Sequence, residues 1–185
     1  MYLLQFDGML QTLDEKSQKG GFLGYGWLIT CNNTEIAHGF GLFAHNRIVN
    51  SNIAEYLALI EGLDSLLDLR IRDEPIVICG DAKCIIDQMT GAASINSFSI
   101  RSLYHRARKL SDQFNHLQWG WVPRNKNKLA DKLSRRGLRQ LFSKPNAYEI
   151  ALNRLNSHPV GPDGFISLLD LRVYNPVNFD KDFTY

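Results

Sequence analysis

The first part of the chain alternates apolar and aromatic runs with short polar stretches, which is the pattern of β-strands joined by turns. These runs cover residues 2–7, 21–30 and 35–43. Only residues 31–34 separate the last two runs, and this spacing indicates a hairpin. The N-terminal segment therefore predicts three strands in an antiparallel meander.

The period changes at residues 52–69, where apolar side chains recur at helical spacing behind the candidate N-cap residues Asn50, Ser51 and Asn52. Strand and helix patterns alternate after this helix. The predicted strands are residues 75–80 and 117–123, and the predicted helices are residues 82–90, 97–115 and 127–141. This order predicts an α/β fold with a mixed five-stranded sheet, in which three antiparallel strands are followed by parallel additions and helices cover both faces.

The C-terminal residues break this alternation. Residues 144–159 can form one helix, and residues 166–174 are apolar enough to form an added edge strand or a docking segment. We therefore expect a catalytic domain over residues 1–142 and an extension over residues 143–185. The extension docks on its own domain, on a second copy or on another protein, and self-docking is the most economical case. A chain cut near residue 142 should keep its site and lose stability.

The composition is that of an ordinary globular protein, with 185 residues, 44% of them hydrophobic and 22% charged. There is no apolar run long enough to span a membrane, and the N-terminus lacks the basic start of a signal peptide. The three cysteines include no CxxC pair, which argues against a disulfide framework or a zinc site. A reducing, cytoplasmic setting is expected.

Positive charge is concentrated in one segment. Residues 101–139 hold 11 Lys and Arg against only two acids, whereas residues 1–100 hold 6 Lys and Arg against 12 acids. Aromatic and amide side chains are interleaved with the basic ones. A solvated helical face would explain each basic residue taken singly, but the whole segment favours a polyanionic partner.

Four acids stand at the ends of predicted elements. Asp7 ends the first strand, Asp81 follows the fourth, Glu55 lies near the start of the long helix and Asp131 near the start of the last. Each one alone could be a turn, cap or solvated helix residue. If the four converge, their charges repel one another unless cations lie among them, and Mg²⁺ favours such oxygen ligands. Two such ions can hold both the attacking and the leaving oxygen of a phosphoryl displacement.

Together, Asp7-Gly8 and residues 50–63, 80–91 and 121–137 resemble, in order and spacing, the four motifs of type 1 ribonuclease H, in its compact archaeal, bacterial and plant-like branch. The resemblance implies an endonuclease that hydrolyses the RNA strand of RNA–DNA hybrids with two Mg²⁺ ions, or Mn²⁺ as a substitute. The residues that it assigns to catalysis and metal binding are Asp7, Glu55, Asp81 and Asp131.

The resemblance also implies contacts with nucleic acid. The residues carried over are Gly8, Asn52, Lys83, Arg124 and Asn127, of which Asn127 is the polar residue that helps to hold the site; the basic helix adds Arg106, Arg108 and Lys109. The chain departs from the family pattern at Ser51 and Ala82, and no histidine lies between the fifth strand and Asp131. These departures bear on turnover and affinity more than on the type of reaction.

Other functions remain open on the same fold. One is a catalytically weak or inactive nucleic-acid-binding module that acts within a larger assembly. A proofreading exonuclease is less favoured, because Gly8 and Met9 follow Asp7 where such enzymes have an Asp-x-Glu pair. A transposase is less favoured as well, because the last acid is Asp131 and not a glutamate on the final helix.

Overall fold

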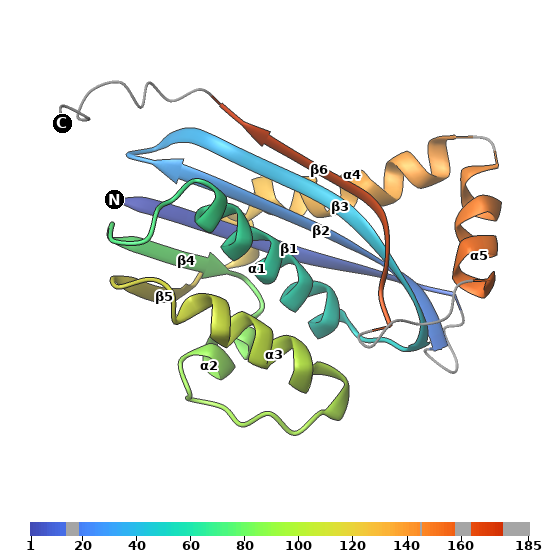
Figure 1. The fold of residues 1–185 in the computed structure, drawn as a ribbon, viewed down its shortest axis with the longest axis horizontal. Coiled ribbons are helices and arrows are strands. Elements are labelled where there is room, and N and C mark those ends of the chain that lie inside the picture. Colours follow the sequence, from blue (N-terminus) through green and yellow to red (C-terminus); the bar gives the residue numbers. More distant parts are fainter. Residues whose placement is uncertain (14–18, 145, 158–163, 176–185) are drawn as a thin grey trace.

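Six strands form the framework, and helices pack on both of its faces (Figure 1). The computed structural model describes residues 1–13, 19–144, 146–157 and 164–175. The strands are β1 (Tyr2–Thr12), β2 (Lys19–Cys31), β3 (Thr34–Ile48), β4 (Ile76–Gly80), β5 (Leu117–Trp121) and β6 (Ile166–Tyr174). The helices are α1 (Ser51–Asp68), α2 (Lys83–Met89), α3 (Phe98–Ser111), α4 (Lys128–Ser143) and α5 (Ala147–Ser157), with a short 3₁₀ helix η1 (Arg124–Lys126) before α4.

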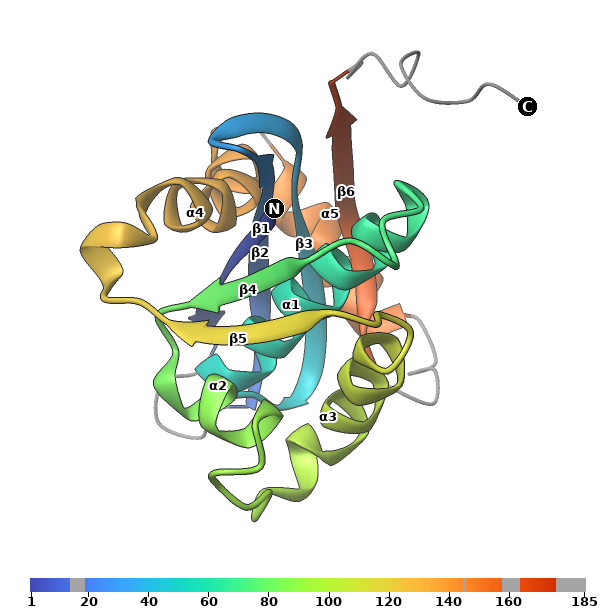
Figure 2. The same cartoon turned by 90° about the vertical axis from the view of Figure 1, so that its left-hand side faces the viewer.

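The strand order is β5-β4-β1-β2-β3-β6. The meander β1-β2-β3 is antiparallel, whereas β4 runs parallel to β1 and β5 parallel to β4. Figure 2 shows the strong twist of this sheet, in which β4 and β5 cross the direction of β2, β3 and β6. The predicted α/β class, the meander and the parallel additions are confirmed.

The predicted number of strands is wrong, because the sheet has a sixth strand. Residues 166–174 form β6, which pairs antiparallel with the outer edge of the 15-residue strand β3. That edge would otherwise leave backbone donors and acceptors unpaired, and the apolar stretch supplies their partners. Strand β1 is also longer than predicted, since it continues past Asp7-Gly8 to Thr12 along β2. Between β1 and β2, residues 14–18 lie outside the described part.

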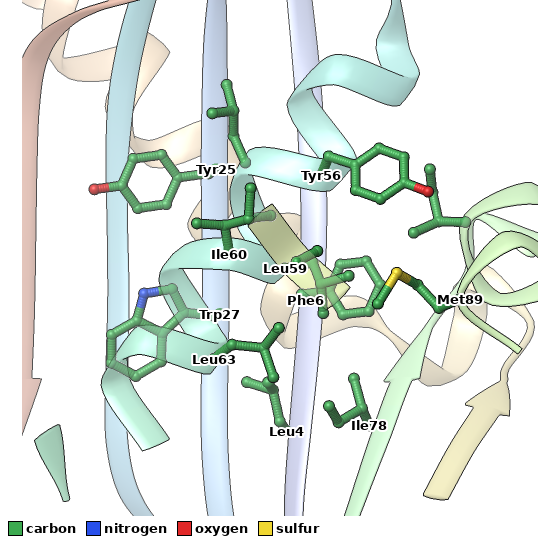
Figure 3. Packing of buried hydrophobic residues seen from close by; sticks show 14 of the residues in the cluster. Leu4, Phe6, Tyr25, Trp27, Tyr56, Leu59, Ile60, Leu63, Ile78 and Met89 are labelled. Atoms are coloured by element: carbon green, nitrogen blue, oxygen red, sulfur yellow. The ribbon is translucent and has the colours of Figure 1, made fainter. Parts of the chain in front are cut away.

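The larger core lies between the sheet and α1, which is buried along most of its length. Figure 3 shows Leu59, Ile60 and Leu63 of α1 against Phe6 and Trp27 of the strands. Helices α2 and α3 complete this layer. Asn50 begins α1 as its N-cap, since its side chain accepts a hydrogen bond from the Ile53 amide at 3.2 Å.

Helices α4 and α5 cover the opposite face in a smaller core. Helix α4 lies directly on the backbone of β2, because a Cβ atom at Gly24 or Gly26 would overlap the backbone of Ser134. The absence of side chains at these two glycines therefore sets how closely α4 approaches the sheet.

Polar contacts tie β6 to the α1 layer. Arg172 of β6 forms ion pairs with Glu61 (2.6 Å) and Asp68 (3.0 Å) of α1, and Tyr25 of β2 donates a hydrogen bond to Asp170 at 2.6 Å. Glu61 is only 6% exposed, and burial raises its pKa while Arg172 opposes the rise. The described part of the extension is therefore built into the sheet, although whether residues 1–142 form a separate domain stays a prediction.

We expect Arg172→Met to lower the free energy of unfolding by about 2–3 kcal/mol, because it leaves the buried Glu61 without its partner. The loss falls below that of a fully buried pair, since the Arg172 side chain keeps 24% exposure. Urea denaturation at pH 7.5 measures it. Arg139→Met is the matched control on an exposed helix position, and the double variant Arg172→Met/Glu61→Met should recover part of the loss. A single variant as stable as the parent would contradict the role given to this pair.

Candidate active site

Asp7 is a buried carboxylate in the middle of the sheet. Residues of β1 alternate between the two faces, so Phe6 points into the α1 core while Asp7 points towards α4. Asp7 is 4% exposed and accepts a hydrogen bond from the hydroxyl of Ser134 in α4. Burial raises the pKa of Asp7 to about 6, with Ser134 opposing the rise and the charges of Asp81 and Asp131 adding to it.

Glu55 reaches the same region from α1 through a close contact between backbones. The Gly8 amide donates a hydrogen bond to Glu55 Oε2 at 3.0 Å, and a Cβ atom at Gly8 would overlap the backbone of Ala54 and Glu55. Burial, followed by the charges of Asp7 and Asp81, raises the pKa of Glu55 well above its ordinary value. Gly8 therefore positions a carboxylate, whether or not it also contacts nucleic acid.

Asp81 follows β4 and is held by Asn127. The Asn127 amide donates to Asp81 Oδ1 at 2.6 Å and to the Phe6 carbonyl at 2.8 Å, so it joins β1, β4 and the start of α4. The side chain of Asn127 is fully buried. This position makes Asn127 a supporting residue for Asp81 rather than a group that faces a ligand.

Asp131 stands at the start of α4 between two guanidinium groups. Arg124 donates to its Oδ1 at 2.5 Å, and Arg135, one turn later, donates to Oδ2 at 2.9 Å and to Oδ1 at 3.1 Å. These hydrogen bonds, with that of Arg135 the largest influence, lower the pKa of Asp131. Beside it lies an open hollow of about 430 Å³, lined by Arg124, Asn125, Lys128 and Asp131.

The four predicted acids thus come from β1, α1, the loop after β4 and α4 to one end of β4, close enough for their charges to interact. Asp7, Glu55 and Asp81 each keep one oxygen that makes no hydrogen bond or ion pair with another described residue, whereas both oxygens of Asp131 are engaged. In the described part of the chain, no three His, Cys, Asp or Glu residues form a ready-made metal cage. The all-oxygen donor set and the mutual repulsion nevertheless suit a hard divalent cation.

The predicted nucleic-acid contacts fall into two groups. Asn52 lies in the first turn of α1 and lowers the pKa of the Cys84 thiol against the rise that burial causes, and Lys83 pairs with Asp87 at 2.6 Å. On α3, Arg106 pairs with Asp64 at 3.2 Å and Arg108 with Asp112 at 3.3 Å. Asn52 and Lys83 lie close to Glu55 and Asp81 in the chain, whereas the charges of Arg106 and Arg108 are partly neutralised by neighbouring acids. Lys109 of the same helix α3 is exposed.

Sequence reasoning missed several residues of this region. Ser134 binds Asp7 across 127 positions of sequence, so no local pattern could reveal the contact. Arg135 could have been found, because it lies four residues after Asp131 on a helix.

Arg47 and Arg101 border a hollow of about 560 Å³ between β3, α1 and α3, beside Phe98, which is 86% exposed.

Comparison with known proteins identifies the family. Residues 5–137 match the model of the family described as reverse transcriptase-like. The chain belongs to this family. The crystal structure of RNase H1 from Halobacterium salinarum NRC-1 aligns with this protein at a TM-score of 0.65 and 29% identity, over 75% of this chain and 98% of that one. The resemblance to type 1 ribonuclease H and the fold class are therefore confirmed for this member of the reverse transcriptase-like family.

Mycobacterial relatives give the same result. The bifunctional protein Rv2228c of Mycobacterium tuberculosis is 32% identical over 114 residues, which is 62% of this chain. The match spans only 30% of that curated relative. The structure of its N-terminal RNase H domain, fused to maltose binding protein, aligns at a TM-score of 0.61 and 29% identity, over 71% of this chain and 94% of that one. For this reverse transcriptase-like protein, none of the helices in the described residues has both the length and the apolar character needed to cross a bilayer.

The raised pKa of Asp7 has a measurable effect on stability without metal. Its value is about 6 in the folded protein against an ordinary 3.8, so its contribution to stability is greatest below about pH 4 and is lost as the pH rises through 6. Asp7→Asn should therefore raise the free energy of unfolding at pH 7.5 by about 1–3 kcal/mol, and the gain should shrink towards pH 4. Urea denaturation in EDTA from pH 4 to 8 measures this.

Asp112→Asn is the matched control, because the Asp112 side chain is 65% exposed. A pH-independent difference between Asp7→Asn and the parent would show that the Asp7 carboxylate carries no such penalty.

Proposed function

We propose that the protein is a metal-dependent endonuclease that hydrolyses the RNA strand of RNA–DNA hybrids. The observation that carries this proposal is the gathering of Asp7, Glu55, Asp81 and Asp131, from four separate segments of the chain, on a fold of the type 1 ribonuclease H kind. Buried carboxylates whose pKa is raised by burial and by neighbouring negative charge, as at Asp7 and Glu55, are suited to cations and phosphate chemistry rather than to structural stability.

The cofactor in this proposal is Mg²⁺, two ions in number, with Mn²⁺ as a substitute. Asp7, Glu55, Asp81 and Asp131 would hold it, and when bound it supplies an activated water and stabilises the charge that develops on the phosphate. The chain itself fixes the carboxylates: Ser134 orients Asp7, the Gly8 amide orients Glu55, and Asn127 orients Asp81. Arg124, 65% exposed at the edge of the site, provides a cation for a backbone phosphate.

Selection of the RNA strand would rest on its 2′-hydroxyl groups, which distinguish RNA from DNA in the minor groove. Asn52 supports this role, since it lies three residues before Glu55 on the same helix and carries both a donor and an acceptor. Residues 1–142 would carry this chemistry, and α5 and β6 of the extension would stabilise the sheet. The proposal concerns this chain alone, because its match covers only 30% of the curated mycobacterial relative and the activities of the remaining part of that relative do not carry over.

One observation favours a second candidate, a nucleic-acid-binding module with weak or no catalysis. Both oxygens of Asp131 are engaged by Arg124 and Arg135, so a cation must compete with two guanidinium groups for this ligand. The two candidates differ in turnover and not in binding.

The cleavage assay uses labelled RNA–DNA hybrid, single-stranded RNA, duplex RNA and duplex DNA, with Mg²⁺ or with EDTA. We expect cleavage of the hybrid alone, and only with Mg²⁺. Asp81→Asn should reduce the rate by a factor of about 10³ or more, because it removes a charged cation ligand, while hybrid binding persists. Glu74→Gln, exposed in the loop before β4, is the matched control.

Binding of the hybrid without cleavage by the parent protein would favour the second candidate. Cleavage of duplex DNA as fast as hybrid would contradict both.

The basic helix α3 gives a separate prediction. Neutralising Arg106, Arg108 and Lys109 together to Gln should weaken hybrid binding and reduce the slope of log affinity against log salt by about 0.7–0.9 for each phosphate that the variant no longer binds. Fluorescence anisotropy from 50 to 300 mM salt measures the slope. The triple variant Arg72→Gln/Arg136→Gln/Lys144→Gln removes the same number of charges elsewhere and controls for net charge. An unchanged slope in the α3 variant would show that its basic residues form a solvated surface.

A further inference from the structure

A groove runs between β1 and the C-terminal half of α4, apart from the predicted nucleic-acid contacts. Its volume is about 490 Å³, and its lining residues are Met9, Gln11, Arg135, Leu138, Arg139, Phe142 and Ser143. Two of these residues are cationic, and the lining as described contains no acid. The groove is therefore apolar at its base and positively charged along one wall.

This groove continues from the candidate active site. Met9 and Gln11 follow Asp7 at every second residue, so they lie on the same face of β1. Arg135 and Arg139 follow Asp131 at intervals of four residues, which correspond to steps of about 6 Å along α4. Arg135 belongs to both places, because it lines the groove and donates to Asp131. A strand bound at the carboxylates could pass directly into the groove.

An aromatic surface stands at the far end. Phe142 is 55% exposed, and its ring stacks on Tyr148 of α5 with centroids 5.5 Å apart and an angle of 26° between the planes. Tyr148 in turn packs on the buried Phe22 at 5.6 Å. Phe142 is thus braced on one side by the core, and its other side is open to a flat group.

Cationic side chains beside an exposed aromatic ring are the features that bind single-stranded nucleic acid, in which phosphates meet the cations and bases stack on the ring. An acidic peptide would satisfy Arg135 and Arg139 but would offer nothing flat to Phe142. Continuity with the carboxylates and the charge of the wall both favour a nucleic-acid strand as the occupant.

We propose that this groove binds unpaired RNA that continues from the hybrid past the cleavage site, with Arg139 at a backbone phosphate and Phe142 stacked on a base. The proposal rests on the proposed function, because the hybrid is what brings the strand to Asp131. It adds a preference for hybrids whose RNA strand extends beyond the duplex.

The test compares binding of two fluorescent hybrids with the same duplex, one blunt and one whose RNA strand carries a ten-nucleotide overhang. A 5′ and a 3′ overhang are measured separately, by anisotropy in EDTA so that no cleavage occurs. We expect one polarity to bind the full-length protein roughly fivefold or more tightly than the blunt hybrid, which corresponds to stacking of a single base. An overhang of DNA in place of RNA shows whether the groove distinguishes the two strands.

Variants place the effect in the groove. Arg139→Gln and Phe142→Ala should each bring the ratio of the two dissociation constants close to one, whereas Phe142→Tyr should restore it by keeping a ring. Arg136→Gln is the matched control, because this arginine of the same helix lies over Phe40, 4.5 Å from the ring centroid and away from the groove. Thermal melting shows whether each variant is folded.

Three outcomes are distinguishable. If the blunt hybrid is bound but neither overhang improves binding, the groove proposal is wrong and the proposed function stands. If an overhang helps equally in Arg139→Gln and Phe142→Ala, the strand binds elsewhere and the groove proposal is again wrong. If hybrids are not bound at all, the proposed function is wrong, and the groove proposal, which rests on it, is wrong with it.

Discussion

The burial of one carboxylate in the middle of a sheet sets the conditions for the rest of the site. Asp7 lies between two helical layers, where water cannot stabilise its charge, and its neighbours add negative charge. The fold accommodates it with a hydroxyl from Ser134 and with backbones that approach at glycine positions, Gly8 towards α1 and Gly26 towards α4. Side chains at those glycines would push both helices away, and the carboxylates would separate. The same few residues therefore determine both how closely the two helices pack on the sheet and how strongly the carboxylates repel one another.

Asp7 and Glu55 experience a different environment from Asp131. Burial raises the pKa of Asp7 and Glu55, whereas Arg135 and Arg124 lower the pKa of Asp131. Asp131 is therefore ionised at neutral pH without any added cation, while Asp7 and Glu55 are poorly compensated. Binding of a cation is therefore most favourable beside Asp7 and Glu55, whose charges lack a cationic partner. At Asp131, a bound cation would only replace an arginine as the partner.

Local patterns predicted what depends on local interactions. The start of α1 at Asn50, the alternation after it and the four acids at element ends are all readable from neighbouring residues. Contacts between distant segments were not predictable in this way. Arg172 binds Glu61, which lies 111 positions away in the sequence, and β6 pairs with the edge of β3 rather than with another apolar surface. The end of β1 was missed because Asp7-Gly8 has the composition of a turn, while pairing with β2 keeps the strand extended to Thr12. The fold class, the acids and Asn127 thus followed from the sequence, whereas the roles of Ser134 and Arg172 followed from packing.

The edge position of β6 has a consequence for synthesis on the ribosome. All four carboxylates and the residues that hydrogen-bond them precede residue 143, so they leave the exit tunnel before β6 does. Until residues 166–174 emerge, the outer edge of β3 stays unpaired and Glu61 lacks Arg172. The nascent chain therefore passes through an interval in which an apolar strand edge is open to other chains, and slow elongation over the last α-helix would lengthen it.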